Sequence, residues 1–255
     1  MSWNAAVDFR KGSPQEARAE PCQDYGKVLK LNADVIVSAV ANGDGKARFS
    51  HIGAKTAVRS ACNTIRANAR RFQSIARNPN DHDAVPVFEA LLGSVQESLK
   101  STAADHLAPI DDLATTLIVF IASPAGLAAM KIGAGFIVYR QSGRQYEFMF
   151  DPGKKTTDIE NQYITQPIAR DNMQVAVQNG LTEFVCASTN ALEPLSMRSD
   201  GWKPHTPFFR PLDQCTALAK DDDEVHRSIR AFLRSKSLTS KVANDCTLML
   251  GGYQD

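Results

Sequence analysis

The order of the predicted helices and strands constrains this fold more than any single motif does. A short apolar strand at 35–40 is followed by two helical segments, at 52–76 and from Pro86 to about residue 107. Apolar residues at spacings of three and four predict the helices. From residue 115 onward, short β-branched runs separated by turn sequences predict strands. Because no helices separate these strands, the order favours an antiparallel meander over an alternating βαβ fold.

The later part of the chain extends this pattern. The predicted strands are 115–122, 127–132, 136–139, 146–150, 174–177, 184–187 and 247–250. Residues 151–172 are polar and predict a loop. Asp221–Glu224 places negative charge at the start of a helix that is expected to reach Leu238, which suits the helix dipole. Asp83 is a candidate cap for the helix that contains Pro86. Two sheets with helices outside them fit this order.

Composition narrows the class of protein. The 255 residues, 43% of them hydrophobic, are enough for one large domain and do not require a second, and with the order of the elements we expect a single domain over 1–255. A net charge of +1 argues against general polyanion binding, so nucleic acid is not an expected partner. No apolar run approaches the roughly 18 residues of a membrane helix. The start at Met1-Ser2-Trp3-Asn4 has no signal-peptide pattern, which predicts a cytoplasmic protein, and five cysteines without a C-x-x-C pair predict reduced thiols.

Five short segments resemble the motifs of the metal-dependent type 2C protein phosphatases in order and spacing. They are Pro21-Cys22-Gln23-Asp24, Val40-Ala41-Asn42-Gly43-Asp44-Gly45, Ala114-Thr115-Thr116-Leu117, Ile132-Gly133-Ala134-Gly135 and Asn244-Asp245-Cys246-Thr247-Leu248. Within that family the chain is most similar to a bacterial branch of compact, single-domain phosphatases. The resemblance implies an α+β fold, a four-layer α-β-β-α sandwich of two antiparallel sheets flanked by helices. It also implies two manganese or magnesium ions between the sheets, which hold the hydroxide that attacks a phosphoserine or phosphothreonine ester.

The family's metal-binding aspartates are replaced at four positions. By resemblance, these positions are Asn42, Ala134, Thr189 and Asn244, in the first, second, third and fourth metal-binding motifs respectively, and Asn190 replaces the glycine of the third. A pair of divalent ions needs several anionic oxygen ligands, and an amide or methyl group supplies no such charge. The glycine of the first motif remains as Gly43. Asp24 is the one family acid in register, whereas Asp245 lies one place late and so on the opposite face of a strand.

These replacements support the hypothesis of a pseudophosphatase, a catalytically degenerate member that binds a partner and has no metal cofactor. No catalytic or metal-binding residue is then expected. The alternative is an active manganese- or magnesium-dependent serine/threonine protein phosphatase with an altered ligand set. In that case the ligands would be Asp24, Asp44 and Asp245.

A basic segment follows the first motif. Between Gly45 and Asn80 there is no acidic residue but there are eight basic ones, at 46, 48, 55, 59, 66, 70, 71 and 77. One interpretation is a solvated helix face that keeps the protein soluble. The other is a binding surface for a protein partner, such as a phosphoprotein or a serine/threonine kinase. Lys46 and Arg48 are the candidate anion-binding residues, because arginine can bind phosphate through two parallel hydrogen bonds.

Histidines and Cys22 offer weaker signals. The histidines, at 51, 82, 106, 205 and 226, share no metal-ligand spacing and are expected to be structural or exposed. Cys22 adjoins Gln23-Asp24, which raises the alternative of a cysteine nucleophile. No histidine partner is evident in the sequence, so we expect a structural thiol.

Overall fold

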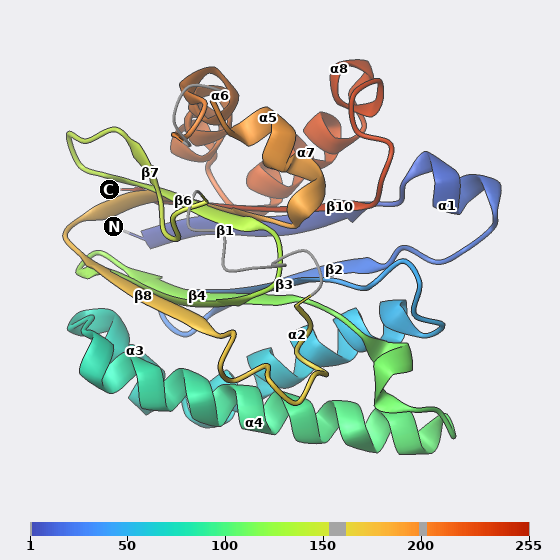
Figure 1. Cartoon of the computed structure of the whole chain (residues 1–255). Helices are drawn as coiled ribbons and strands as arrows, with labels where there is room; N and C mark the ends of the chain where they lie inside the picture. The colour runs from blue at the N-terminus through green and yellow to red at the C-terminus, as the bar shows by residue number, and fades with distance from the viewer. Residues whose placement is uncertain (1, 153–161, 199–202, 255) are drawn as a thin grey trace.

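The structure, a computed structural model, is a four-layer sandwich in which two antiparallel sheets pack face to face and helices cover their outer sides (Figure 1). It describes residues 2–152, 162–198 and 203–254. This α-β-β-α arrangement is the fold class that the sequence predicts. Within these ranges no helix is long and apolar enough to cross a membrane.

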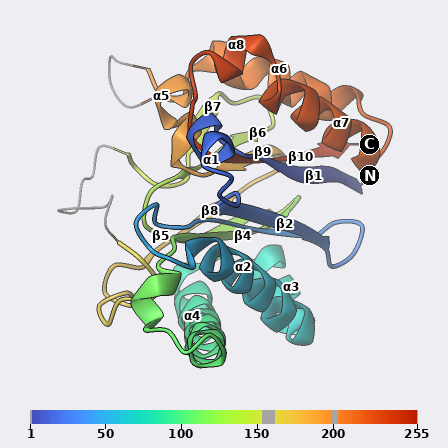
Figure 2. The same cartoon turned by 90° about the vertical axis from the view of Figure 1, so that its right-hand side faces the viewer.

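Each sheet has five strands. In the first sheet the strands, in spatial order, are β1 (Ser2–Arg10), β10 (Cys246–Gln254), β9 (Thr182–Ser188), β6 (Phe136–Gln141) and β7 (Tyr146–Phe148). In the second they are β2 (Asp24–Lys30), β3 (Ile36–Asn42), β4 (Leu117–Ser123), β5 (Gly126–Ile132) and β8 (Gln174–Asn179). The N- and C-terminal strands pair along their length, from Ser2 with Gln254 to Arg10 with Cys246, so the two chain ends lie side by side (Figure 2).

The helices form the two outer layers. The second sheet is covered by α2 (Ser50–Ala67), α3 (Ala69–Arg77) and α4 (Asp81–Asp105), and the first by α5 (Glu193–Ser196), α6 (Thr206–Leu218), α7 (Asp222–Leu233) and α8 (Lys236–Thr239) (Figure 1). Three short elements, α1 (Ser13–Ala17) and the 3-10 turns η1 (Ile110–Leu113) and η3 (Asn190–Leu192), lie in connections.

Three hydrophobic clusters fill the spaces between the four layers. The sequence of strand β3 is apolar at successive positions and does not alternate between apolar and polar residues, because both of its faces are buried. Val37 and Ala39 pack in the cluster under α2–α4, whereas Ile36 and Val40 pack in the cluster between the sheets. A strand that is buried on both faces needs apolar residues at successive positions.

The motif segments all come to one end of this sandwich. Asp24 at the start of β2 pairs with Asn42 at the end of β3, and Ile132 at the end of β5 pairs with Leu117 at the start of β4. In the first sheet, Ser188 at the end of β9 pairs with Leu248 near the start of β10. Turns from both sheets therefore meet at this end, which we call the motif end.

Several predicted helix bounds were wrong. The segment 52–76 is two helices, α2 and α3, separated at Asn68, whose side chain donates a hydrogen bond to the Thr64 carbonyl. Helix α4 begins before Pro86, at Asp81, because Asn80 rather than Asp83 is the cap: the Asn80 side chain accepts from the Asp83 N–H at 2.9 Å.

The acidic helix start was predicted correctly, but the helix ends early. The Asp221 side chain caps α7 by accepting from the Glu224 N–H at 2.8 Å. The chain leaves the helix after Leu233 and restarts as α8, which Ser235 caps.

Other elements were missed. Strand β1 carries mixed polar and apolar residues, and α6 contains Pro207 and Pro211, so neither shows a clean periodic pattern. Of the predicted loop 151–172, residues 153–161 lie outside the described residues, and 164–172 consists of turns and a bend.

Candidate functional site

The first-motif turn is held tightly between strands and the start of α2. The Gly43 N–H donates to the Gln23 carbonyl at 3.0 Å. A Cβ added at Gly43 would lie 2.6 Å from Ser50 Cβ, so the turn requires glycine. The backbone N–H and carbonyl of Asn42 are both engaged, with the hydroxyls of Thr116 and Thr115 at 3.0 Å each. The backbone of the first motif is therefore well formed even though its aspartate is absent.

Asp24 and Thr189 join the two sheets at the motif end. The Thr189 hydroxyl donates to Asp24 Oδ2, and the same Thr189 oxygen accepts from the Thr247 N–H at 3.0 Å. Asp24 is 2% exposed, and its Oδ1 has no hydrogen-bond partner among the described residues. Burial raises the pKa of Asp24 to about 7, against the lowering effect of the Thr189 hydrogen bond. The retained acid is thus only partly ionised at neutral pH.

A pair of amides occupies the neighbouring positions. Asn42 Nδ2 donates to Asn190 Oδ1 at 2.9 Å. Asn42 comes from the second sheet and Asn190 from the turn that follows β9 in the first sheet. By resemblance these are an aspartate and a glycine position of the family. Here two neutral groups satisfy each other across the sandwich.

Asp245 has a structural role. Its Oδ1 accepts from the Gly12 N–H at 2.5 Å and its Oδ2 from the Gln23 N–H at 2.6 Å. Both carboxylate oxygens are therefore committed to backbone amides that tie the segment after β1 to the start of β10. Asn244, at the family position, is exposed.

Asp44 lies beside the first-motif turn. Its Oδ1 accepts from the Lys46 N–H at 3.1 Å, which closes a local turn. Burial raises the pKa of Tyr163, and the charge of Asp44 and its hydrogen bond with Tyr163 raise this pKa further. The three acids of the alternative ligand set thus differ in their surroundings: Asp24 is bonded to a hydroxyl, Asp245 to two backbone amides, and Asp44 to its own turn.

A lysine on β5 and a glutamate at the start of α5, both of which sequence reasoning missed, contact the second-motif turn. Gly133 and Gly135 have φ values of +87° and +113°, so this turn depends on glycine on both sides of Ala134. The Gly135 N–H donates to Glu193 Oε1 at 2.6 Å, and Lys131 Nζ donates to the Gly135 carbonyl at 3.3 Å. Lys131 is 7% exposed. The sequence signal for this buried charge is that Lys131 is the single charged residue in the apolar strand Gly126–Ile132.

The residues present at the motif end do not fit a pair of divalent metal ions. In the chain as far as it is described, no group of three or more His, Cys, Asp or Glu side chains is placed to hold a metal ion. The donors near Asp24 are a hydroxyl and two amides, and a buried ammonium lies at the adjacent turn. Manganese and magnesium prefer several charged oxygen ligands, and this set supplies one buried carboxyl group, that of Asp24.

Lys46 and Arg48 lie on the surface where the first motif enters α2. Both side chains are exposed, and the Arg48 guanidinium lies 4.7 Å from the centre of the Phe49 ring. Farther along α2, exposed Lys55, Arg59 and Arg66 are spaced by four and seven residues and so share one helix face. We call Lys46, Arg48, Lys55, Arg59 and Arg66 the basic face. In the described parts of the chain, none of the five has a carboxylate within ion-pair distance.

Cys22 has the character of a structural thiol. Its Sγ contacts the carbonyl oxygens of Arg10 and Asp24 at 3.8 and 3.6 Å. Burial, followed by the charges of Asp24 and Asp245, raises the pKa of the Cys22 thiol well above its ordinary value. A thiol that resists ionisation is a poor nucleophile.

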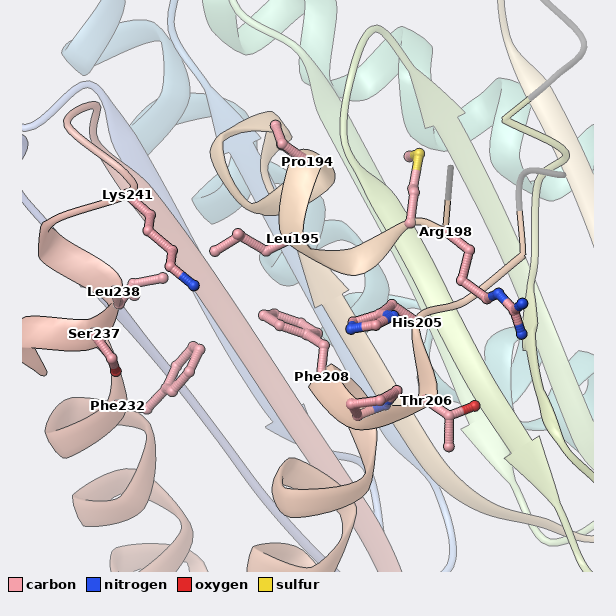
Figure 3. Close-up of a pocket in the computed structure, with 12 residues that line it drawn as sticks. Pro194, Leu195, Arg198, His205, Thr206, Phe208, Phe232, Ser237, Leu238 and Lys241 are labelled. Atoms are coloured by element: carbon pink, nitrogen blue, oxygen red, sulfur yellow. The ribbon is translucent and has the colours of Figure 1, made fainter. Parts of the chain in front are cut away.

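A separate hollow of about 770 Å³ opens outside the first sheet, among α5, α6 and α8 (Figure 3). Phe208, Phe232, Leu195 and Leu238 give it an apolar lining, and the Lys241 side chain extends over it. None of the motif positions lines this hollow. It is distinct from the motif end.

Comparisons with known proteins agree on the fold. The chain is 25% identical over 256 residues to Serine/threonine-protein phosphatase 3 of Escherichia coli (strain K12), covering 98% of each chain. Among solved structures, Serine/threonine phosphatase Stp1 from Staphylococcus aureus matches with a TM-score of 0.65 at 11% identity, over 100% of this chain and 96% of that one. PppA of Pseudomonas aeruginosa matches with a TM-score of 0.60 at 12% identity, over 99% and 98%.

The family assignment rests on sequence as well as on shape. The sequence profile described as Protein phosphatase 2C matches residues 11–234. That range includes the first three motifs, whose backbone turns are built as described above although their acids are replaced. The chain therefore belongs to the protein phosphatase 2C family.

Proposed function

We propose that this protein is a pseudophosphatase, which uses the type 2C phosphatase fold to bind a protein partner and does not hydrolyse phosphate esters. The observation that carries the proposal is the pairing of neutral groups where the family has metal-binding acids. Asn42 is bonded to Asn190, and Thr189 is bonded to Asp24. The two amides and the Thr189 hydroxyl thus make hydrogen bonds within the protein, and Asp24 Oδ1 is the one buried oxygen of this set without a partner in the described residues, which supports a motif end that forms without a metal.

A manganese titration with an aryl phosphate substrate tests this proposal. We expect no saturable heat of Mn²⁺ binding in calorimetry, and a turnover equal to that of an Asp24→Ala variant. Turnover that depends on Mn²⁺ and clearly exceeds the Asp24→Ala control would show that the protein is an active phosphatase.

The basic face is the surface that we propose for the partner. It begins beside the first-motif turn at Lys46 and continues along α2 to Arg66. Its lack of carboxylate partners in the described residues leaves its positive charge available to an acidic or phosphorylated segment, such as one on a phosphoprotein or a serine/threonine kinase. Binding that depends on these charges weakens as salt rises.

Phosphopeptide binding measures the contribution of this surface. We expect a phosphoserine peptide to bind more tightly than its unphosphorylated form, and Lys46→Ala/Arg48→Ala to reduce that preference. Arg144→Ala, at an exposed arginine in the turn between β6 and β7, is the matched control. Equal binding of both peptides to the native protein would remove the basic face from the proposal.

The alternative is an active serine/threonine phosphatase with altered ligands, and the similarity to the Escherichia coli protein over nearly the whole chain favours it. Under this alternative, Mn or Mg would be bound through Asp24, Asp44 and Asp245. Asp245 would then have to release the Gly12 and Gln23 amides. The manganese titration above separates the two functions, because only the alternative requires metal binding.

A cytoplasmic location completes the proposal. All five cysteines are free thiols, three of them buried. Free thiols are typical of proteins in a reducing compartment.

A further inference from the structure

The second-motif turn encloses a buried ammonium group. Lys131 lies on β5 at the motif end and is 7% exposed. Residues two and four places earlier on the same strand, Ala129 and Leu127, belong to the cluster between the sheets. Because side chains alternate along a strand, the Lys131 side chain also lies on the side that faces the other sheet.

Electron-rich groups surround this ammonium. Its Nζ donates to the Gly135 carbonyl at 3.3 Å and lies 5.6 Å from the centre of the Phe150 ring. The Glu193 carboxylate attracts it as well and opposes the effect of burial, which lowers the pKa of Lys131. A carbonyl, an aromatic face and a nearby carboxylate are the groups with which proteins hold a cation away from water.

Lys131 and Glu193 act on the same peptide segment from opposite sheets. Lys131 belongs to the second sheet, and Glu193 begins α5, just after β9 of the first sheet. Glu193 accepts from the Gly135 N–H while Lys131 donates to the Gly135 carbonyl. Gly135 has no room for a side chain, since an added Cβ would lie 2.7 Å from the Ser188 carbonyl oxygen. The two charges thus fix the point where the chain crosses between the sheets.

We propose that the Lys131 ammonium is an internal cation that replaces the metal ions between the sheets. The inference rests on the proposed metal-free function and explains how the motif end keeps a positive charge between its sheets without bound metal. It has a consequence for engineering. Restoring the four aspartates should give only weak metal binding, because a dication would also have to approach the fixed charge of Lys131.

Two restored proteins test this consequence. The first carries Asn42→Asp, Ala134→Asp, Thr189→Asp and Asn244→Asp, and the second adds Lys131→Met. Mn²⁺ affinity is measured from the loss of the free-ion electron paramagnetic resonance signal, with circular dichroism to show that both proteins fold. We expect Lys131→Met to tighten Mn²⁺ binding by at least about tenfold, since it removes like-charge repulsion. Lys27→Met, at a half-buried lysine on β2, added to the same four changes is the matched control and should leave the affinity unchanged.

Equal Mn²⁺ affinity with and without Lys131→Met would overturn the inference. If the restored proteins do not fold, a double-mutant cycle of Lys131→Met and Glu193→Gln in the native chain decides the matter. We expect each single change to lower the melting temperature and the double change to cost less than their sum. Additive losses would equally overturn it. Manganese-dependent hydrolysis by the native protein is a different result, which would overturn the proposed function.

Discussion

Two polar clusters in this protein handle buried charge in opposite ways. On β6, the Arg140 guanidinium is bonded through Nε to Asp213 Oδ2 at 2.6 Å and through Nη1 to Glu183. The Tyr146 hydroxyl donates to the same Asp213 oxygen at 2.8 Å. At the motif end, by contrast, the Asp24 carboxyl accepts from the Thr189 hydroxyl, its Oδ1 has no hydrogen-bond partner among the described residues, and no protein cation is bonded to it there.

The pKa directions follow from these partners. The hydrogen bond that Arg140 donates to Asp213 raises the pKa of Arg140, so the cluster on β6 is stabilised in its ionised form. Burial raises the pKa of Asp24 to about 7, so this carboxyl is stabilised in its uncharged form. The difference teaches that this fold tolerates buried carboxylates where a protein cation is bonded to them. At the motif end, where members of the family bind metal cations, most of the carboxylates are replaced.

Removing the cation from the ionised cluster should have the largest effect. Arg140→Met removes the cation from Asp213 and Glu183, and the carboxylate of Asp213, which is 7% exposed, keeps only the neutral Tyr146 donor among the described residues. Breaking a fully buried ion pair on one side costs about 3–5 kcal/mol in the free energy of unfolding, and because Arg140 and Glu183 are partly exposed we expect the lower end of this range, about 3 kcal/mol. Urea denaturation measures this loss. Arg144→Met, at an exposed arginine, is the control and should cost little. A loss below about 1 kcal/mol for Arg140→Met would mean that the ion pairs on β6 contribute no more than exposed ion pairs do, so that the two clusters would not differ in how they stabilise carboxylates.

The raised pKa of Asp24 should make the free energy of unfolding depend on pH. The unfolded Asp24 has a pKa of about 3.9, so the acid is protonated in both states at low pH. As the pH rises, the unfolded chain ionises first. The contribution of Asp24 to stability is therefore fully present below about pH 4 and is lost as the pH rises through the folded pKa of about 7.

We expect Asp24→Asn to flatten this dependence. Between about pH 5 and pH 7.5 the native protein should lose about 2 kcal/mol more stability than the variant, measured by urea denaturation at each pH. Asp105→Asn, at an exposed aspartate, should reproduce the native curve. If Asp24→Asn gives the native slope too, the carboxyl is ionised in the folded protein and the motif end is not neutral.

The hydroxyl bridge between the sheets should contribute less. Thr189→Val keeps the shape of the side chain but removes the donor to Asp24 and the acceptor for the Thr247 N–H. Two buried polar groups are then unpaired, and we expect a loss of about 1.5 kcal/mol. A double-mutant cycle with Asp24→Asn isolates the bond itself, since a coupling energy near zero would mean that Thr189 stabilises the protein by packing alone.

The sequence predicts the layers better than the ends of the elements. Apolar strands such as 35–40 and the helix periodicity locate the core, because burial on one or both faces leaves a direct trace in residue type. The break at Asn68 and the cap at Asn80 depend on single side-chain hydrogen bonds, to Thr64 and Asp83, which periodicity does not record. Strand β1 is identified by its pairing with β10, at the other end of the chain.

The sequence also predicts the candidate site only in part. The motif sequence located Asp24, Asn42 and Thr189, which the structure brings to one end of the sandwich. It could not show that Asn190 bonds Asn42 or that Glu193 reaches the turn beside Lys131, because these contacts join segments from opposite sheets. A lone lysine in an apolar strand signals a buried charge, but its partners follow only from the fold.

The smallest expected effect concerns the amide that replaces the first-motif aspartate. Asn42→Ala removes the bond to Asn190, but Asn42 is partly exposed and water can replace that bond. The backbone at this position keeps its bonds to Thr115 and Thr116. We therefore expect a loss of about 0.5 kcal/mol in urea denaturation, with Asn63→Ala, at an exposed residue of α2, as the control. A loss as large as that of Thr189→Val would mean that the two amides share in the link between the sheets. A small loss would mean that the backbone alone holds the turn, so that the side chain at position 42 is free to vary and the change from aspartate altered the charge of the motif end and not its fold.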